Sequence, residues 1–152
     1  MTFWDINYNN KEKQVLKDVK DALNEGEDPG IEDDWAIGEL AEQGYLTTIK
    51  LIMKTGKVNY QVKNQYPLTI ASLNQRYDVV KYFLSLKPVI KKDDLRPLWG
   101  ALKEGDIKMV NILLGYPQYK NWLENFPEEF KDPTQLKTLK KLSVGKFADL
   151  LR

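Results

Sequence analysis

The residues that could do chemistry in this 152-residue chain are carboxylates, lysines, hydroxyls and tyrosines, because the sequence contains no Cys and no His. Their absence excludes a thiolate nucleophile, a disulfide, an imidazole base and a zinc site with the usual nitrogen or sulfur ligands. An enzyme would need a carboxylate or lysine pair, with or without an oxygen-ligated Mg²⁺ or Ca²⁺. No spacing in the sequence indicates such a pair, so we expect no catalytic residue, no metal and no cofactor.

The densest run of carboxylates surrounds a predicted turn at residues 25–34. Its spacing lacks the central Gly and the terminal bidentate Glu of a calcium-binding EF-hand loop, so we interpret it as a solvated turn that could also contact a partner. Near the carboxyl end, lysines alternate with leucines at helical spacing, which is typical of an amphipathic capping helix. That cluster consists of Lys137, Lys140, Lys141 and Lys146.

The formal net charge is only +1, which argues against a nucleic-acid partner, since such proteins usually carry a basic excess. Residues 1–48 hold 4 lysines against 12 acids, a net charge of −8, whereas residues 49–152 hold 19 bases against 10 acids, a net charge of +9. The chain lacks a basic leader followed by an apolar run, and it lacks a stretch of 18 apolar residues. We therefore expect a cytoplasmic protein that makes no membrane contact.

Three segments of the chain, at 35–56, 66–87 and 96–117, align on their apolar residues. Each segment reads as two short helices separated by a polar break, and each helix alone is too short to be stable in water. A fixed period of this length predicts a stack of repeats that stabilise one another. Two series of equivalent positions advance by 31 and then 30 residues: Leu40, Ala71 and Ala101, and Ile49, Val80 and Val110.

These segments resemble ankyrin repeats. The family's motifs T-P-L-H-x-A-A and V-V-K-x-L-L are approximated by YPLTIAS with DVVKYFL and by RPLWGAL with KMVNILL, and glycines stand at the family's turns. The family's turn-tightening Thr is replaced by Trp35, Tyr66 and Arg96, and its His by Gly38, Thr69 and Trp99. The resemblance implies an all-α ankyrin-repeat solenoid of about five helix pairs, in which the outer two are divergent caps.

We expect a single ankyrin-repeat domain over residues 1–152. Its N-terminal capping repeat would occupy 1–30, with a first helix somewhere in residues 2–12. The central repeats would occupy 31–60, 61–90 and 91–118, and an insertion with C-terminal capping helices would occupy 119–152.

The resemblance also implies which residues would touch a partner. In ankyrin repeats the variable contact positions are the turn residues before the first helix and the two residues that end it, and together they line a concave surface. To these we add Tyr60 as an aromatic at a turn tip and Trp99 because it replaces a His beside the turn. The implied positions are Glu32, Asp34, Glu42 and Gln43; Lys63, Gln65, Leu73 and Asn74; and Lys92, Asp93, Leu95, Lys103 and Glu104.

We expect a monomeric, non-catalytic module that binds another protein through this concave surface. Inhibition of an enzyme or toxin, as in an immunity or counter-defence protein, would suit a small solenoid with no chain left for another activity. Two alternatives remain open. One is a small enzyme that uses carboxylates or lysine, and the other is a nucleic-acid or membrane contact through the basic residues 49–152.

Overall fold

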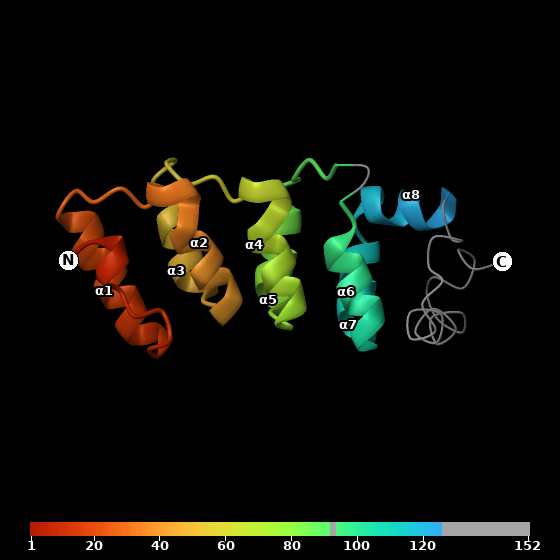
Figure 1. The fold of residues 1–152 in the computed structure, drawn as a ribbon, viewed down its shortest axis with the longest axis horizontal. Helices are drawn as coiled ribbons and strands as arrows, with labels where there is room; N and C mark the ends of the chain where they lie inside the picture. Colours follow the sequence, from red (N-terminus) through yellow and green to blue (C-terminus); the bar gives the residue numbers. More distant parts are fainter. Residues whose placement is uncertain (92–93, 126–152) are drawn as a thin grey trace. The chain divides into compact units, whose positions relative to one another are not determined.

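The computed structural model describes residues 1–91 and 94–125, apart from the side chains of 122–125 (Figure 1). Within that part of the chain every regular element is helical, which confirms the expected all-α class. The elements are η1 (Phe3–Asp5), α1 (Glu12–Asn24), α2 (Ile31–Gln43), α3 (Leu46–Met53), α4 (Val62–Leu73), α5 (Tyr77–Ser85), α6 (Arg96–Glu104), α7 (Ile107–Leu114) and α8 (Pro117–Asn125).

The chain divides into two compact units, Met1–Pro88 and Val89–Arg152, which we describe separately. In the first unit, α2 and α4 lie side by side, and each forms an antiparallel pair with the helix that follows it, α3 or α5 (Figure 1). We call α2 and α4 the inner helices. Helix α1 packs against α3 and extends the stack towards the N-terminus.

The core of the first unit is built from the apolar positions that recur along the sequence. Ile37 and Leu40 of α2, Ile49 of α3, and Leu68 and Ala71 of α4 are completely buried. A small residue at position 71 lets neighbouring helices approach closely, as expected for stacked repeats. Burial of these side chains stabilises helices that are individually too short to persist.

Each inner helix of the first unit begins with one turn of left-handed backbone. Glu32, Asp33 and Asp34 have φ values of 53°, 53° and 59°, and the equivalent Lys63, Asn64 and Gln65 have 51°, 54° and 66°. The right-handed part of each helix starts only after this turn, at Trp35 and at Tyr66. The sequence places the helix opening at Tyr66-Pro67 but gives no indication of the left-handed turn before it, because neither set contains the Gly that usually marks such backbone.

The helix expected within residues 2–12 is reduced to the single turn η1. Thr2 and Asp5 form a reciprocal capping box around it. The asparagines that follow favour turns over helix, and the Asn7 side chain accepts a hydrogen bond from the Asn9 backbone N–H at 3.1 Å. Phe3 is nonetheless buried, so this segment still covers the end of the stack.

In the second unit, α6 and α7 form a helix pair and α7 also contacts α8. The Asp106 carboxylate caps α7 by accepting from the Met109 backbone N–H at 3.1 Å. The segment expected to be an insertion begins with helix α8. The C-terminal capping helices expected beyond it lie outside the described residues. Across the described part of the chain, no helix has both the length and the apolar character needed to span a membrane.

Candidate functional site

The predicted contact residues at the ends of the inner helices lie at the surface of the first unit. Leu73 is 49% exposed, and Glu42, Gln43 and Asn74 are half-buried. Two of these side chains already have partners within the chain. The Gln43 amide donates to Asn9 Oδ1 at 3.0 Å, and the Asn74 amide donates to the Ile70 carbonyl at 2.8 Å. Glu42 and Leu73 are therefore the more available of the four.

The predicted contact residues before the inner helices all fall in the left-handed turns. Glu32 and Lys63 are exposed there. Asp34 accepts a hydrogen bond from the Asn59 backbone N–H at 2.9 Å and so joins the left-handed turn of α2 to the loop that precedes α4. Gln65 is only 4% exposed, and its amide donates to Gln61 Oε1 at 2.9 Å. The structure thus gives Asp34 and Gln65 internal contacts, and burial removes Gln65 from any partner surface.

Tyr60 was expected at a turn tip, but its side chain packs inward. Its ring stacks on Phe83 of α5 with a centroid distance of 5.7 Å and an interplanar angle of 11°. Its hydroxyl donates to the Leu86 carbonyl at 3.2 Å. The loop before α4 therefore folds back over α5, and these two contacts of Tyr60 hold it there.

The remaining predicted residues belong to the second unit. Lys92 and Asp93 lie outside the described residues. Leu95, at the start of α6, is only 3% exposed, so burial removes it from the predicted surface. Trp99 is 40% exposed, and Lys103 and Glu104 at the end of α6 are exposed as well.

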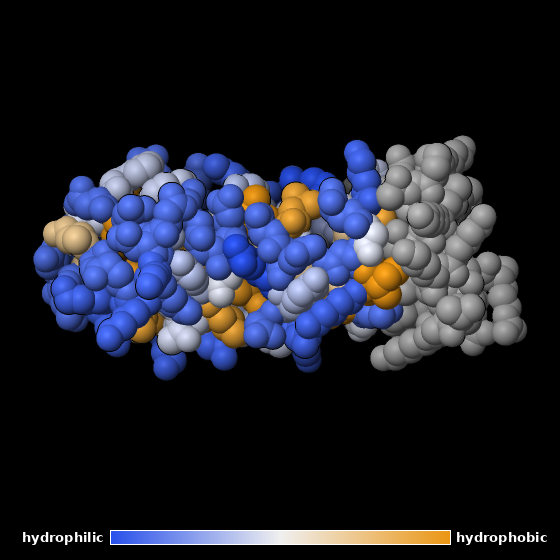
Figure 2. All heavy atoms as spheres, turned by 90° about the horizontal axis from the view of Figure 1, so that it is seen from below, coloured by the Kyte–Doolittle hydropathy of each residue, from blue (hydrophilic) through white to orange (hydrophobic). Residues whose placement is uncertain are grey.

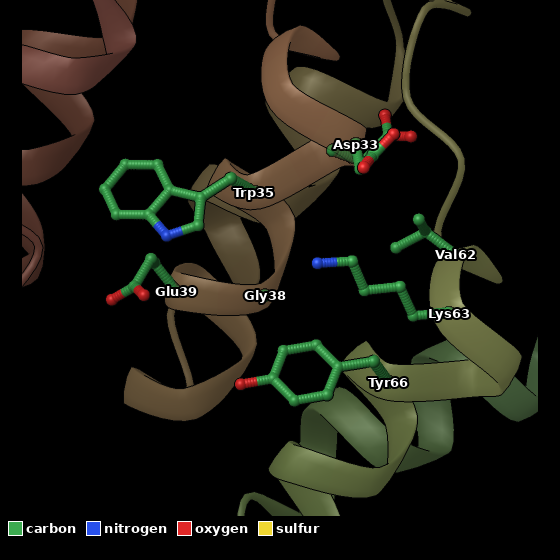
Figure 3. Close-up of a pocket in the computed structure, with 8 residues that line it drawn as sticks. Asp33, Trp35, Gly38, Glu39, Val62, Lys63 and Tyr66 are labelled. Atoms are coloured by element: carbon green, nitrogen blue, oxygen red, sulfur yellow. The ribbon is translucent and has the colours of Figure 1, made fainter.

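A pocket of about 310 Å³ opens between α2 and the start of α4, within the first unit (Figure 3). Its volume is at the lower end of the range that holds bound ligands. Two aromatic rings, three carboxylates and one lysine contribute to the wall. The lining residues are Asp33, Asp34, Trp35, Gly38, Glu39, Val62, Lys63 and Tyr66.

The electrostatics of this pocket are acidic. Burial raises the pKa of the Glu39 carboxyl above its usual range, and the nearby charge of Glu42 raises it further. Burial also raises the pKa of the Tyr66 hydroxyl, with additional contributions from Glu42 and Glu39. Lys63 is the single cation of the lining. Among the described residues, no cluster of His, Cys, Asp or Glu has the arrangement needed to hold a metal ion.

The family model for ankyrin repeats, in three copies, matches residues 15–123. The chain belongs to the ankyrin-repeat family. No curated protein and no solved structure gives a match. Ankyrin repeats are generally protein–protein interaction modules without catalytic activity, which is the coarse function that the family supports.

The pocket forms where this ankyrin chain departs from its family's motif. Gly38 stands in the position of the family's His, and a Cβ built there would lie 3.0 Å from Cε1 of Tyr66. Tyr66, which stands in the position of the family's Thr, therefore uses the space left by the missing side chain. Two substitutions in successive ankyrin repeats thus compensate each other across the boundary between the repeats.

Trp35 is the second departure, and it is held by the N-terminal segment. Its indole stacks on Trp4 with a centroid distance of 4.8 Å and an interplanar angle of 24°, and it meets the Tyr8 ring edge-on at 5.2 Å and 87°. Such pairs fix the orientation of a ring as well as burying it. The wall of the pocket formed by Trp35 is therefore positioned before any ligand arrives.

Four residues of the lining were not expected from the sequence to form a site: Trp35, Gly38, Glu39 and Tyr66. The contact positions were transferred from the ankyrin family, in which the Thr and His positions tighten the turn. The sequence signal that could have identified the site is a pair of replacements in successive repeats. Gly38 replaces the family's His in one repeat, and Tyr66, a large aromatic, replaces the family's Thr in the next.

Proposed function

We propose that this ankyrin-repeat chain is a non-catalytic module that binds a protein partner through the surface of its inner helices and their left-handed turns. We define this inner surface by Glu32, Glu42, Lys63 and Leu73. The observation that carries the proposal is that these four side chains are exposed or half-buried on helices whose own packing is complete. A partner can therefore be bound without rearrangement of the repeats.

The composition of the surface favours a polar interface. Three of the four residues that define the inner surface, Glu32, Glu42 and Lys63, are charged. Figure 2 views the molecule from below, from the side opposite the left-handed turns, and the described part of that face is also mostly hydrophilic, with small separate apolar patches. Interfaces between proteins that also exist separately have a similar mixture, with charged groups setting specificity and association rate. Within this proposal, the chain acts by covering a functional face of an enzyme or toxin and thereby inhibits it.

Purification of the tagged full-length chain from its native host, followed by identification of the bound protein, tests this function. The double variant Glu32→Lys/Glu42→Lys should reduce recovery of the partner by at least tenfold, because it reverses two charges on the inner surface. The matched control is Asp78→Lys, which reverses an exposed charge on α5. Equal recovery with both variants would reject the inner surface as the binding site.

The inhibitory role has a separate test. The purified partner is assayed for its own activity with increasing amounts of this chain, and activity should fall as the complex forms. Binding without any loss of activity would reject inhibition while leaving the binding function intact.

A further inference from the structure

The pocket between α2 and α4 has the chemistry of a receptor for one particular side chain. We propose that it receives an arginine side chain from the protein partner, an inference that rests on the proposed binding function. Three features of the pocket support this: the balance of charge in the lining, the two aromatic residues, and the position of Lys63.

The charge of the lining is unbalanced. Asp33, Asp34 and Glu39 contribute three negative charges, and Lys63 contributes one positive charge. The ion pairs found among the described residues all involve other groups, so Glu39 has no cation within 4 Å. The ionised form of Glu39 is unfavourable, because its carboxylate is half-buried and lies near the charge of Glu42. A bound cation would stabilise it.

The aromatic walls favour a guanidinium over an ammonium ion. The lining includes Trp35 and Glu39 from α2 and Tyr66 from α4, and Figure 3 shows the two rings on either side of Gly38. A guanidinium is planar and weakly hydrated, so it can stack on aromatic faces while donating to a carboxylate. Tyr66 is 41% exposed, which leaves its ring accessible to an incoming side chain. An ammonium ion is strongly hydrated and gains less in such a place.

Lys63 gives the pocket a cation of its own. Its side chain extends from the start of α4 towards α2 and lines the pocket (Figure 3). It lies in the left-handed turn and is exposed to solvent, so it can leave the pocket without disturbing the core. An incoming arginine would displace it, and Lys63 would act as a competitor for the ligand.

An anion held by Lys63 is the opposing interpretation of the same pocket. The two interpretations predict opposite responses to two substitutions. Removing the Lys63 ammonium group should abolish binding of an anion but strengthen binding of arginine. Removing the Glu39 charge should strengthen binding of an anion and weaken binding of arginine.

The test is an NMR titration of the isotope-labelled full-length chain with N-acetyl-arginine amide. Saturable shifts are expected for the Trp35 indole N–H and the Gly38 backbone N–H. The citrulline analogue, which has nearly the same shape and no charge, should produce no saturable shift. The lysine analogue should bind at least fivefold more weakly than arginine, and inorganic phosphate serves as the anionic probe.

Variants then separate the two interpretations. Glu39→Gln should weaken arginine binding by about tenfold, the effect of losing one partly buried charge pair. Lys63→Ala should tighten arginine binding by at least twofold. The matched controls Asp78→Asn on α5 and Lys20→Ala on α1 are exposed sites outside the lining and should leave the apparent Kd unchanged.

Failure of this inference is distinguishable from failure of the proposed function. If citrulline or phosphate shifts the pocket resonances as strongly as arginine, or if arginine shifts none of them, the arginine pocket is rejected. Partner recovery that still depends on Glu32 and Glu42 would then leave the binding function standing. If arginine binds the pocket but partner recovery does not depend on Glu32 and Glu42, the inner surface is rejected as the binding site instead.

Discussion

The environment of Glu39 illustrates how a single residue can indicate a binding site before the ligand is known. The Glu39 carboxylate is partly withdrawn from water, Glu42 lies near enough to raise its pKa, and no cation of the described residues lies within 4 Å of it. A side chain placed only for stability would more often be neutral or paired at such a position. Its charge therefore has a predictable effect on stability.

Replacement of Glu39 by Gln should stabilise the chain at neutral pH and have no effect in acid. Because the folded-state pKa lies above the ordinary value of 4.5, the folded protein holds the proton more tightly than the unfolded chain. The wild type therefore loses stability as the pH rises through the folded pKa, and the variant does not. The gain at pH 7 should stay below about 1 kcal/mol, because the carboxylate is only half-buried and solvent screens its charge.

Urea midpoints of the wild type and Glu39→Gln at several pH values between 3.5 and 7 measure this effect. A control comes from Glu42→Gln, which removes one cause of the raised pKa. In that background the pH-dependent gain from Glu39→Gln should shrink. A gain that is constant across the pH range would contradict the assignment.

The left-handed turn gives a second prediction at the residue scale. Glu32→Gly should be neutral or stabilising by up to about 1 kcal/mol, because glycine adopts a φ of 53° without the cost borne by other residues. Asp34→Gly relieves the same backbone but removes the acceptor of the Asn59 N–H, so it should be less stable than Glu32→Gly by about 1 kcal/mol. Denaturant midpoints that rank the two variants in the opposite order would contradict this.

At the scale of elements, the repeats of the first unit are joined by equivalent residues that reach back to the preceding repeat. The Tyr45 hydroxyl donates to the Asn10 carbonyl at 2.6 Å, and Arg76 Nε donates to the Glu42 carbonyl at 2.8 Å. Positions 45 and 76 are one repeat apart. Each bond satisfies a backbone oxygen of the preceding repeat, so each supports the stacking of the helices directly.

Gly44→Ala tests the second of these joints. Gly44 has a φ of 78°, and an added Cβ would lie 2.8 Å from Cδ of Arg76. Gly56→Ala is the matched control, because Gly56 has a φ of 70° with nothing within 4 Å of the added Cβ. Both variants pay about 1–2 kcal/mol for the left-handed backbone. Gly44→Ala should lose about a further 1 kcal/mol in denaturant unfolding through the displaced Arg76, and equal losses would show that this contact contributes nothing.

The small residue in the helix stack gives another prediction at this scale. Ala71 is completely buried in α4, so Ala71→Leu should overpack the neighbouring helices and cost roughly 1–3 kcal/mol. Leu73→Ala on the exposed end of the same helix is the control and should change the free energy of unfolding by no more than about 0.5 kcal/mol. An unchanged urea midpoint for Ala71→Leu would mean that this position is not packed against its neighbours.

The elements were more predictable than the site. Ala71 and Ile49 lie on a period that only stacked repeats explain, and both are buried as that period requires. The left-handed turns were not predictable, since no Gly marks them and tertiary packing overrides local preference there. Gln65 was assigned to a partner surface by analogy with the family, and Tyr60 as an aromatic at an expected turn tip. Each is instead used inside the chain, because neither kind of assignment reveals which internal contacts a particular sequence makes.

At the scale of the whole molecule, charge is divided along the chain. Residues 1–48 carry a net charge of −8 and residues 49–152 carry +9. The pocket lining lies on both sides of this division, with Glu39 in the acidic segment and Lys63 in the basic one. A partner that presents a basic surface to α2 would be attracted before contact.

The association rate with such a partner should depend strongly on salt. Raising the ionic strength from ~0.01 M to ~1 M shortens the Debye length from about 30 Å to about 3 Å. The association rate constant should fall by at least tenfold over that range, while the dissociation rate should change less. Stopped-flow or surface-binding kinetics with the purified partner measure both, and a salt-independent association rate would contradict steering by the acidic segment.

The pocket is divided between successive repeats, with Trp35, Gly38 and Glu39 supplied by one and Val62, Lys63 and Tyr66 by the next. It is therefore a property of a repeat boundary, and its copy number can grow with the length of the stack. Packed helices lie about 8–10 Å apart, and a peptide in the polyproline II conformation advances about 3.1 Å per residue with three residues per turn, so every third side chain faces the same side. A lengthened chain could carry both halves of the lining in each repeat and would then select peptides by the spacing of their arginines. We expect it to prefer peptides with arginine at every third position over peptides with a single arginine.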